Sequence, residues 1–206
     1  MGMEITCFDL EGVFVPEIWI NVAEATGIDE LRLTTRDIAN YDELMNHRLA
    51  ILEREKIGIA DIQAVIAQMR PLPGAVEFLD WARANFQVVI LSDTFYEFAA
   101  PLMSQLGQPV LFCHNLITDN RGMISGYALR MPSGKLNAVK ALKALNFAVF
   151  AAGDSYNDTA MLLEADYGIL FDPPQPVIDQ FPGLPVVRSF AELRHGLCAV
   201  SSRPLV

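Results

Sequence analysis

The sequence predicts an α/β fold in which a Rossmann-like parallel β-sheet is covered by helices on both faces. Three short apolar runs, at residues 5–8, 86–91 and 147–152, alternate along the chain with segments of helical period. Strands that alternate with helices in this way form parallel sheets with right-handed crossovers. We therefore interpret the three runs as buried strands of one sheet.

The composition indicates the size and the setting of this fold. With 206 residues, 52% of them hydrophobic and 19% charged, the chain can form one well-buried domain with a smaller insertion. Its formal net charge of -10 argues against nucleic acid as a partner. The three cysteines have no CxxC spacing and suggest neither a disulfide framework nor a zinc knuckle. Without a signal peptide or an apolar stretch that could span a bilayer, we expect a cytoplasmic protein with no membrane partner.

The segment between the first two strands is expected to be helical, with no strand in it. Pro16 suits a first helical position, and Gly27 is expected to end the helix that follows. Arg48 interrupts an apolar stripe of helical spacing, and Asp61 is expected to cap the next helix. These helices are expected at residues 17–26, 41–56 and 62–69.

After the breaker Pro71-Leu72-Pro73-Gly74, helices and strands are expected to alternate. Asp119-Asn120-Arg121-Gly122 predicts the turn of a hairpin within residues 115–129. Helices are expected at residues 75–84, 97–106, 135–145, 158–164 and 190–197. Strands are expected at residues 86–91, 110–113, 147–152, 167–170 and 186–187. We therefore divide the chain into a core domain, residues 1–15 and 73–206, and a helical cap domain inserted after the first strand, residues 16–72.

Polar side chains follow the ends of three predicted strands. Asp9 and Glu11 follow the first strand at alternate positions, so both project on the same side. Ser92 and Asp93 follow the second strand, and Asp154 follows the third. In open α/β sheets, ligands bind beyond these strand ends, near the topological switch point. Like charges held close together there favour a bound cation, although Asp9 and Glu11 alone would also suit a solvated turn.

Four motifs, in their order along the chain, resemble those of haloacid dehalogenase-type phosphatases: Asp9-Leu10-Glu11-Gly12, Ser92-Asp93, Lys135 and Gly153-Asp154-Ser155-Tyr156-Asn157-Asp158. The resemblance covers roughly residues 3–170. Within this superfamily the chain is most similar to phosphoserine phosphatases, and especially to the branch that also acts as a homoserine phosphotransferase. The resemblance implies a haloacid dehalogenase-like fold with a small helical cap. It also implies an Mg²⁺-dependent enzyme that takes the phosphoryl group of O-phosphoserine and passes it to water or to homoserine.

The same resemblance implies catalytic and metal-binding roles. Asp9 would be the nucleophile that forms an aspartyl-phosphate, and Glu11 would be the general acid and base. Asp9, Asp154 and the backbone carbonyl of Glu11 would bind Mg²⁺, with Asp158 steadying the ion or its waters. Glu11 stands where Asp is commoner in the family, which implies a slower or differently partitioned second step.

Four residues would contact the phosphoryl group: Ser92, Asp93 through its backbone amide, Lys135 and Asn157. Ser92 and Asp93 have a structural alternative, because both residue types also form strand-end turns and helix caps; the alternative for Asn157 is a helix cap. Lys135 lies in the first turn of a predicted helix, where a cation opposes the macrodipole. A bound anion would remove that conflict, although an exposed lysine at this position would not need a bound anion.

The resemblance also implies that Arg48 binds the carboxylate of the amino-acid substrate and that Glu17 binds its ammonium group. The alternative is that Arg48 reaches solvent along its stem and that Glu17 only favours the start of a helix. His47, His114 and His195 are scattered without metal-ligand spacing, and we interpret them as surface or core residues.

Two other functions stay open. A receiver-like signalling module also places acidic residues, a hydroxyl and a lysine around Mg²⁺, but it would not need the helical insertion. A phosphatase of this fold that acts on another small metabolite, such as a sugar phosphate, would share all four motifs. Serine and homoserine differ by one methylene group, worth about 0.8 kcal/mol on burial, so the sequence leaves both acceptors open.

Overall fold

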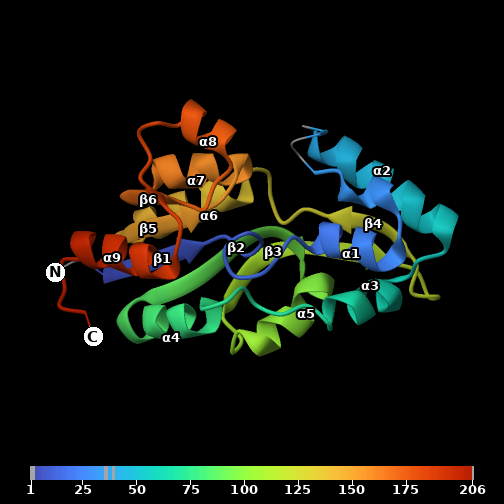
Figure 1. Ribbon diagram of the computed structural model, residues 1–206, viewed down its shortest axis with the longest axis horizontal. Helices are drawn as coiled ribbons and strands as arrows, with labels where there is room; N and C mark the ends of the chain where they lie inside the picture. The colour runs from blue at the N-terminus through green and yellow to red at the C-terminus, as the bar shows by residue number, and fades with distance from the viewer. Residues whose placement is uncertain (1–2, 35–36, 39, 206) are drawn as a thin grey trace.

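The chain forms a seven-stranded β-sheet with helices on both faces (Figure 1). The computed structural model describes residues 3–34, 37–38 and 40–205. The strand order is β4-β3-β2-β1-β5-β6-β7, and β3 and β4 are the antiparallel pair while the other pairs are parallel. The predicted α/β class with a mostly parallel sheet is confirmed.

The strands of the described chain are β1 (Met3–Phe8), β2 (Gln87–Phe95), β3 (Val110–Thr118), β4 (Ile124–Ala128), β5 (Phe147–Gly153), β6 (Tyr167–Phe171) and β7 (Val186–Val187). The α-helices are α1 (Ile18–Thr26), α2 (Tyr41–Glu55), α3 (Ile59–Ile66), α4 (Ala75–Asn85), α5 (Tyr96–Gln105), α6 (Gly134–Ala144), α7 (Thr159–Glu164), α8 (Gln175–Gln180) and α9 (Phe190–Val200). Two short 3₁₀ helices are η1 (Asp29–Arg32) and η2 (Tyr156–Asp158). None of the helices in this part of the chain has the length and apolar character that a bilayer span requires.

Among the differences from the prediction, those in β2, α3 and α8 have a clear physical reason. β2 continues to Phe95, because a bulge after Leu91 carries the strand through polar residues while it stays beside β3. α3 begins at Ile59, and Asp61, expected as its cap, instead accepts a hydrogen bond from the backbone N–H of Gly58 at 2.8 Å. α8 was not among the predicted helices, and it forms with Pro176 near its start because proline is compatible with the first turn of a helix.

Alternate side chains of the central strands pack into two separate layers. Phe8 and Phe150 belong to a core that contains residues of α4, α5 and α9. Cys7 and Val149 belong to a second core with residues of α6, α7 and α8. Because both of its faces are covered, β5 is apolar at every position, whereas β1 also contains two buried polar residues, Glu4 and Thr6.

The register of β1 places the predicted site at one edge of the sheet. β1 lies between β2 and β5, and Phe8 pairs with Ile90 on one side and with Ala152 on the other. The backbone N–H of Asp9 donates to the carbonyl oxygen of Ala152 at 2.9 Å. The carboxyl ends of β1, β2 and β5 therefore meet at the point where the strand order switches direction, which is where open α/β sheets bind ligands.

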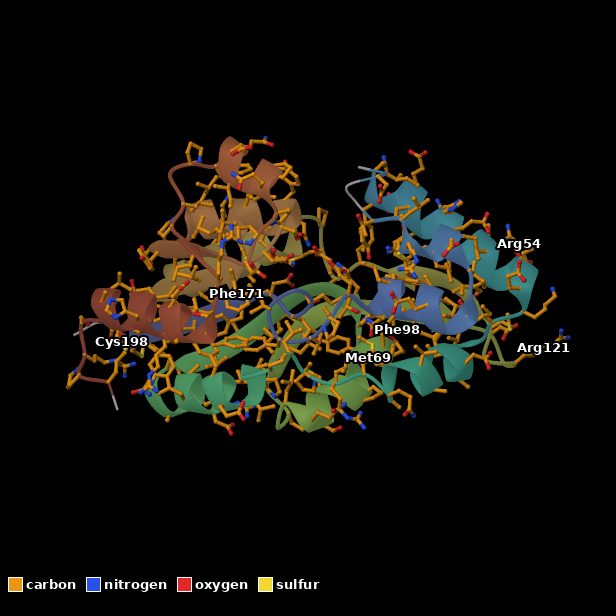
Figure 2. The ribbon with its side chains drawn as sticks, viewed as in Figure 1. Arg54, Met69, Phe98, Arg121, Phe171 and Cys198 are labelled. Carbon is orange, nitrogen blue, oxygen red and sulfur yellow. The ribbon has the colours of Figure 1, made fainter. Side chains whose placement is uncertain are left out.

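The segment inserted after β1 lies at one end of the molecule, where α1, α2 and α3 are close to the hairpin of β3 and β4 (Figure 1). The backbone N–H of Ile59 donates to the carbonyl of Gly122 at 2.8 Å. In the same region the ring of Trp19 meets that of Phe98, labelled in Figure 2, with centroids 5.5 Å apart. These contacts hold the inserted helices beside the edge of the sheet that carries the strand ends.

Candidate active site

The turn after β1 brings two strand ends together. Asp9 follows β1 and is 4% exposed. Gly12 has a φ of +79°, and a Cβ atom there would lie 2.5 Å from Cγ of Asp154. Glycine is therefore required at this position for its backbone conformation and for the space that it leaves. The result is a close approach between the first strand end and the carboxylate that follows β5.

Three buried carboxylates form a cluster at this edge. Asp9, Asp154 and Asp158 each offer an oxygen atom, and these atoms lie within 4.8 Å of one another. Burial raises the pKa of Asp9 well above its ordinary value, and the charge of Asp158 adds to this effect. Carboxylate oxygens are ligands that Mg²⁺ prefers, so the residues present fit this ion. Asp158, expected to act from behind the ligands, lies close enough to be one.

The backbone around η2 fixes the position of Asp158. Its Oδ2 accepts hydrogen bonds from the backbone N–H groups of Asp154, at 3.0 Å, and Ser155, at 3.1 Å. A Cβ atom at Gly153 would lie 2.4 Å from Cγ of Asp158, so only glycine fits at the end of β5. The Asp158 carboxylate is therefore held in the cluster by the backbone of the segment that carries Asp154.

Lys135 places a positive charge against the carboxylate cluster. Its Nζ atom lies 2.8 Å from Oδ1 of Asp9, 2.7 Å from Oδ1 of Asp158 and 3.6 Å from Oδ2 of Asp93. Burial would lower the pKa of Lys135, but the charges of Asp158, Asp9 and Asp93 raise it well above its ordinary value. The lysine in the first turn of α6 thus faces anions, as the macrodipole argument predicted, and these anions are the carboxylates of the site.

Ser92 and Asp93 lie in the bulged part of β2, within the strand and not after it as expected. Oγ of Ser92 accepts a hydrogen bond from the backbone N–H of Thr94 at 3.2 Å, and Ser92 does not cap α5. The carboxylate of Asp93 accepts a hydrogen bond from Nδ2 of Asn157 at 2.9 Å. The Asp93 carbonyl accepts one from the Tyr41 hydroxyl at 3.1 Å. The Asp93 side chain therefore has contacts that the sequence did not predict.

Glu11 links the turn after β1 to the start of α1. Its Oε2 accepts a hydrogen bond from the backbone N–H of Ile18 at 2.7 Å. Burial, together with the charge of Glu17, raises the pKa of Glu11 to about 7. A carboxyl group with this pKa is partly protonated near neutral pH, which a group that both donates and accepts protons requires.

Arg48 and Glu17 lie on the inserted helices. Arg48 is buried, so its guanidinium does not extend into solvent as a snorkelling arginine would. Its Nη2 donates to the carbonyl of Leu33 at 2.8 Å, and the group lies 4.5 Å from the ring centroid of Trp19. Among the residues that the structure describes, its Nε has no hydrogen-bond partner. Glu17 precedes α1 and is half-buried, and its side chain makes no capping hydrogen bond.

The structure brings the predicted residues together around one pocket of about 100 Å³. The predicted residues that line it are Asp9, Glu11, Glu17, Arg48, Ser92, Asp93, Lys135, Asp154 and Asn157. Asp158 lies beneath this lining and is fully buried. Thr34 and Tyr41 also line the pocket, and the sequence did not single them out as binding residues.

The comparisons with known proteins agree with this geometry. The sequence profile of the haloacid dehalogenase-like hydrolases matches residues 6–166. The chain is 58% identical over 205 residues to a phosphoserine phosphatase of Pseudomonas syringae pv. tomato, a match that covers 100% of this chain and 86% of the relative. It is 57% identical over 203 residues to the phosphoserine phosphatase ThrH of Pseudomonas aeruginosa, covering 98% and 99% of the two chains.

Solved structures show the same fold at lower identity. A crystal structure of phosphoserine phosphatase in apo form matches with a TM-score of 0.76 and 20% identity, covering 94% of this chain and 98% of the other. A phospho-aspartyl intermediate analogue of phosphoserine phosphatase matches with a TM-score of 0.78 and 17% identity, covering 95% and 99%.

Proposed function

This chain belongs to the haloacid dehalogenase-like hydrolase family, and from that premise we propose that it hydrolyses O-phospho-L-serine through an aspartyl-phosphate on Asp9. Homoserine is a second acceptor in this proposal. The observation that carries it is the placement of a buried Asp9 in one pocket with Lys135 and Asp154, next to the buried carboxylate of Asp158. The names of the two Pseudomonas relatives support phosphoserine as the substrate.

Mg²⁺ is the proposed cofactor. Asp9, Asp154 and Asp158 offer carboxylate oxygens to it, and the backbone carbonyl of Glu11 is a further proposed ligand. When bound, the ion would offset the negative charge that a phosphoryl group brings to these carboxylates. Lys135 balances part of the negative charge of the cluster, so Mg²⁺ is the only further cation that the proposal includes.

In the proposed reaction, a carboxylate oxygen of Asp9 forms a bond to phosphorus while the bond from phosphorus to the serine oxygen breaks. Glu11 gives its proton to the departing serine oxygen. The ionised Glu11 then takes a proton from the acceptor, which is water or the hydroxyl group of homoserine. The acceptor oxygen forms a bond to phosphorus while the bond from phosphorus to the Asp9 oxygen breaks. Lys135 and Ser92 hold the phosphoryl oxygens during both transfers.

The amino-acid end of the substrate is assigned to the cap domain, residues 16–72, and the phosphoryl end to the core domain, residues 1–15 and 73–206. Arg48 would bind the carboxylate, which gives its buried Nε the partner that it lacks among the described residues. Glu17, on the rim of the same pocket, would accept the ammonium group.

The test is a set of phosphomonoesters assayed with and without Mg²⁺, in the presence and absence of homoserine. We expect turnover of O-phosphoserine that needs Mg²⁺ and is abolished in Asp9→Asn, with O-phosphohomoserine formed when homoserine is added. Faster turnover of a sugar phosphate would favour the metabolite phosphatase. A stable phosphorylated protein without turnover would favour the receiver-like module.

A further inference from the structure

The carboxylate of Asp93 faces three hydrogen-bond donors inside the site. Its Oδ2 accepts from Nδ2 of Asn157 at 2.9 Å and lies 3.6 Å from Nζ of Lys135. Its Oδ1 lies 3.6 Å from Nε2 of His114. An ionised carboxylate offers acceptors only, so it can face all three donors without conflict. An amide of the same shape would turn a donor towards at least one of them.

His114 presents an N–H group to Asp93. The backbone N–H of Arg130 donates to Nδ1 of His114 at 3.1 Å, so Nδ1 carries no proton. The proton of the neutral ring is therefore on Nε2, the atom that faces Asp93. The ring is buried, with its centroid 6.4 Å from that of Tyr41 and 6.3 Å from that of Phe95. His114 thus holds one side of the Asp93 carboxylate from a fixed position.

The orientation of Asn157 is also fixed. Its Oδ1 accepts a hydrogen bond from the Ser155 hydroxyl at 2.5 Å, which leaves Nδ2 to face Asp93. Burial alone would raise the pKa of Asp93, but Lys135, His114 and Asn157 together hold it well below its ordinary value. Asp93 is therefore ionised, although an extra negative charge beside a phosphoryl site opposes phosphate binding. A carboxylate in this place needs a role that outweighs the repulsion.

We propose that Asp93 and His114 form a positioning pair: Asp93 orients the ammonium of Lys135 and the amide of Asn157 towards the phosphoryl group, and His114 orients Asp93. Donors that are oriented before the substrate binds need no reorganisation in the transition state. This inference rests on the proposed function, because it concerns the same phosphoryl transfer. The side chains of the pair do not touch the reacting atoms in this proposal.

The test measures kcat and KM for four variants. We expect Asp93→Asn to lower kcat about 10–100-fold and His114→Phe to lower it about tenfold, with little change in KM. His114→Gln keeps a hydrogen-bond donor near the position of Nε2, and we expect its kcat to lie close to that of the wild-type protein. The double variant Asp93→Asn with His114→Phe should be no slower than Asp93→Asn alone, because His114 acts through Asp93.

His195 is exposed on α9 and supplies the matched control, since His195→Phe and His195→Gln make the same changes away from the site. Both should keep the wild-type kcat. The proposed pair is wrong if His114→Phe also keeps it, if His114→Gln is as slow as His114→Phe, or if the two single losses multiply in the double variant.

A second measurement separates this inference from the proposed function. Nitrogen-15 NMR of the histidine rings should show that His114 is neutral with its proton on Nε2, and its Nε2–H signal should shift in Asp93→Asn. A proton on Nδ1, or no shift, would overturn the pair. The NMR measurement does not depend on enzymatic turnover, so it tests the pair separately. The absence of phosphatase activity in the wild-type protein would instead overturn the proposed function.

Discussion

Replacing Gly12 by alanine tests whether the acidic cluster depends on the close approach of the turn after β1. The new Cβ would lie 2.5 Å from Cγ of Asp154 and 2.6 and 2.8 Å from its two carboxylate oxygens. Real Cβ contacts essentially never fall below 3.0 Å, and ordinary contacts begin at 3.4 Å. The Asp154 carboxylate must therefore withdraw by about 1 Å, or the turn must move by as much.

Two effects of Gly12→Ala can be given magnitudes. The φ of +79° is left-handed, which for a residue with a Cβ atom costs about 1–2 kcal/mol of folding free energy. A displacement of about 1 Å at a reacting site lowers turnover by about 100-fold. If Asp154 binds Mg²⁺, the affinity for the ion should fall with it.

Gly27→Ala is the matched control. Gly27 has a φ of +71°, and a Cβ atom there would meet nothing within 4 Å. Urea unfolding should show the cost of the left-handed backbone in both variants, with a larger loss in Gly12→Ala because of its added contact. Only Gly12→Ala should lose phosphoserine turnover and Mg²⁺ affinity by titration calorimetry. If Gly12→Ala has the same turnover and the same Mg²⁺ affinity as Gly27→Ala, this result refutes the steric argument.

Three other predictions concern charged groups. Arg48→Ala should slow phosphoserine hydrolysis at least tenfold, about the value of one charge-assisted hydrogen bond, and leave hydrolysis of an aryl phosphate nearly unchanged; equal losses would contradict its assignment. Lys135→Met leaves the carboxylates of Asp9 and Asp158 without their cation. Urea unfolding should therefore show a loss of about 3–5 kcal/mol in the free energy of unfolding in EDTA, and a smaller loss with Mg²⁺. Equal losses would contradict the proposal that Mg²⁺ binds these same carboxylates. Burial would raise the pKa of Glu4, but hydrogen bonds from residues 201–203 lower it, so Glu4→Gln should cost about 1–3 kcal/mol at neutral pH. Glu4 stabilises the fold above the unfolded pKa of about 4.3, so this difference should shrink as the pH falls below that value; a constant difference would contradict the lowered pKa.

The buried strands and the longer helices were predictable because local pattern and tertiary environment agree. β5 is apolar on both faces because helices cover both, and β1 departs from this pattern only at the buried Glu4 and Thr6 within residues 4–8. α2 carries one buried stripe that includes Arg48. The extension of β2 to Phe95 was not predictable from Ser92-Asp93-Thr94, since these residues favour turns in isolation. The extension depends on pairing with β3 after the bulge, where Phe95 lies opposite His114.

The same contrast between local sequence pattern and strand pairing explains which residues of the site could be predicted. Asp9 and Asp154 directly follow apolar strands, and this local signal placed them correctly at one sheet edge. The contact between Asp93 and His114 joins residues from two strands whose register is set by the bulge, so no local pattern indicates it. Asp158 was expected to steady the ion or its waters, and η2 brings its carboxylate to the backbone N–H of Asp154, within the acidic cluster itself.

Trapping the phosphorylated protein tests the role of Asp9 most directly. The wild-type protein is mixed with O-phosphoserine and Mg²⁺, quenched in acid within one turnover, digested and analysed by mass spectrometry. We predict one phosphoryl group on the peptide that contains Asp9, with none in Asp9→Asn. Turnover with a phosphoryl group on another residue, or with no phosphorylated peptide at any quench time, would contradict the proposed mechanism.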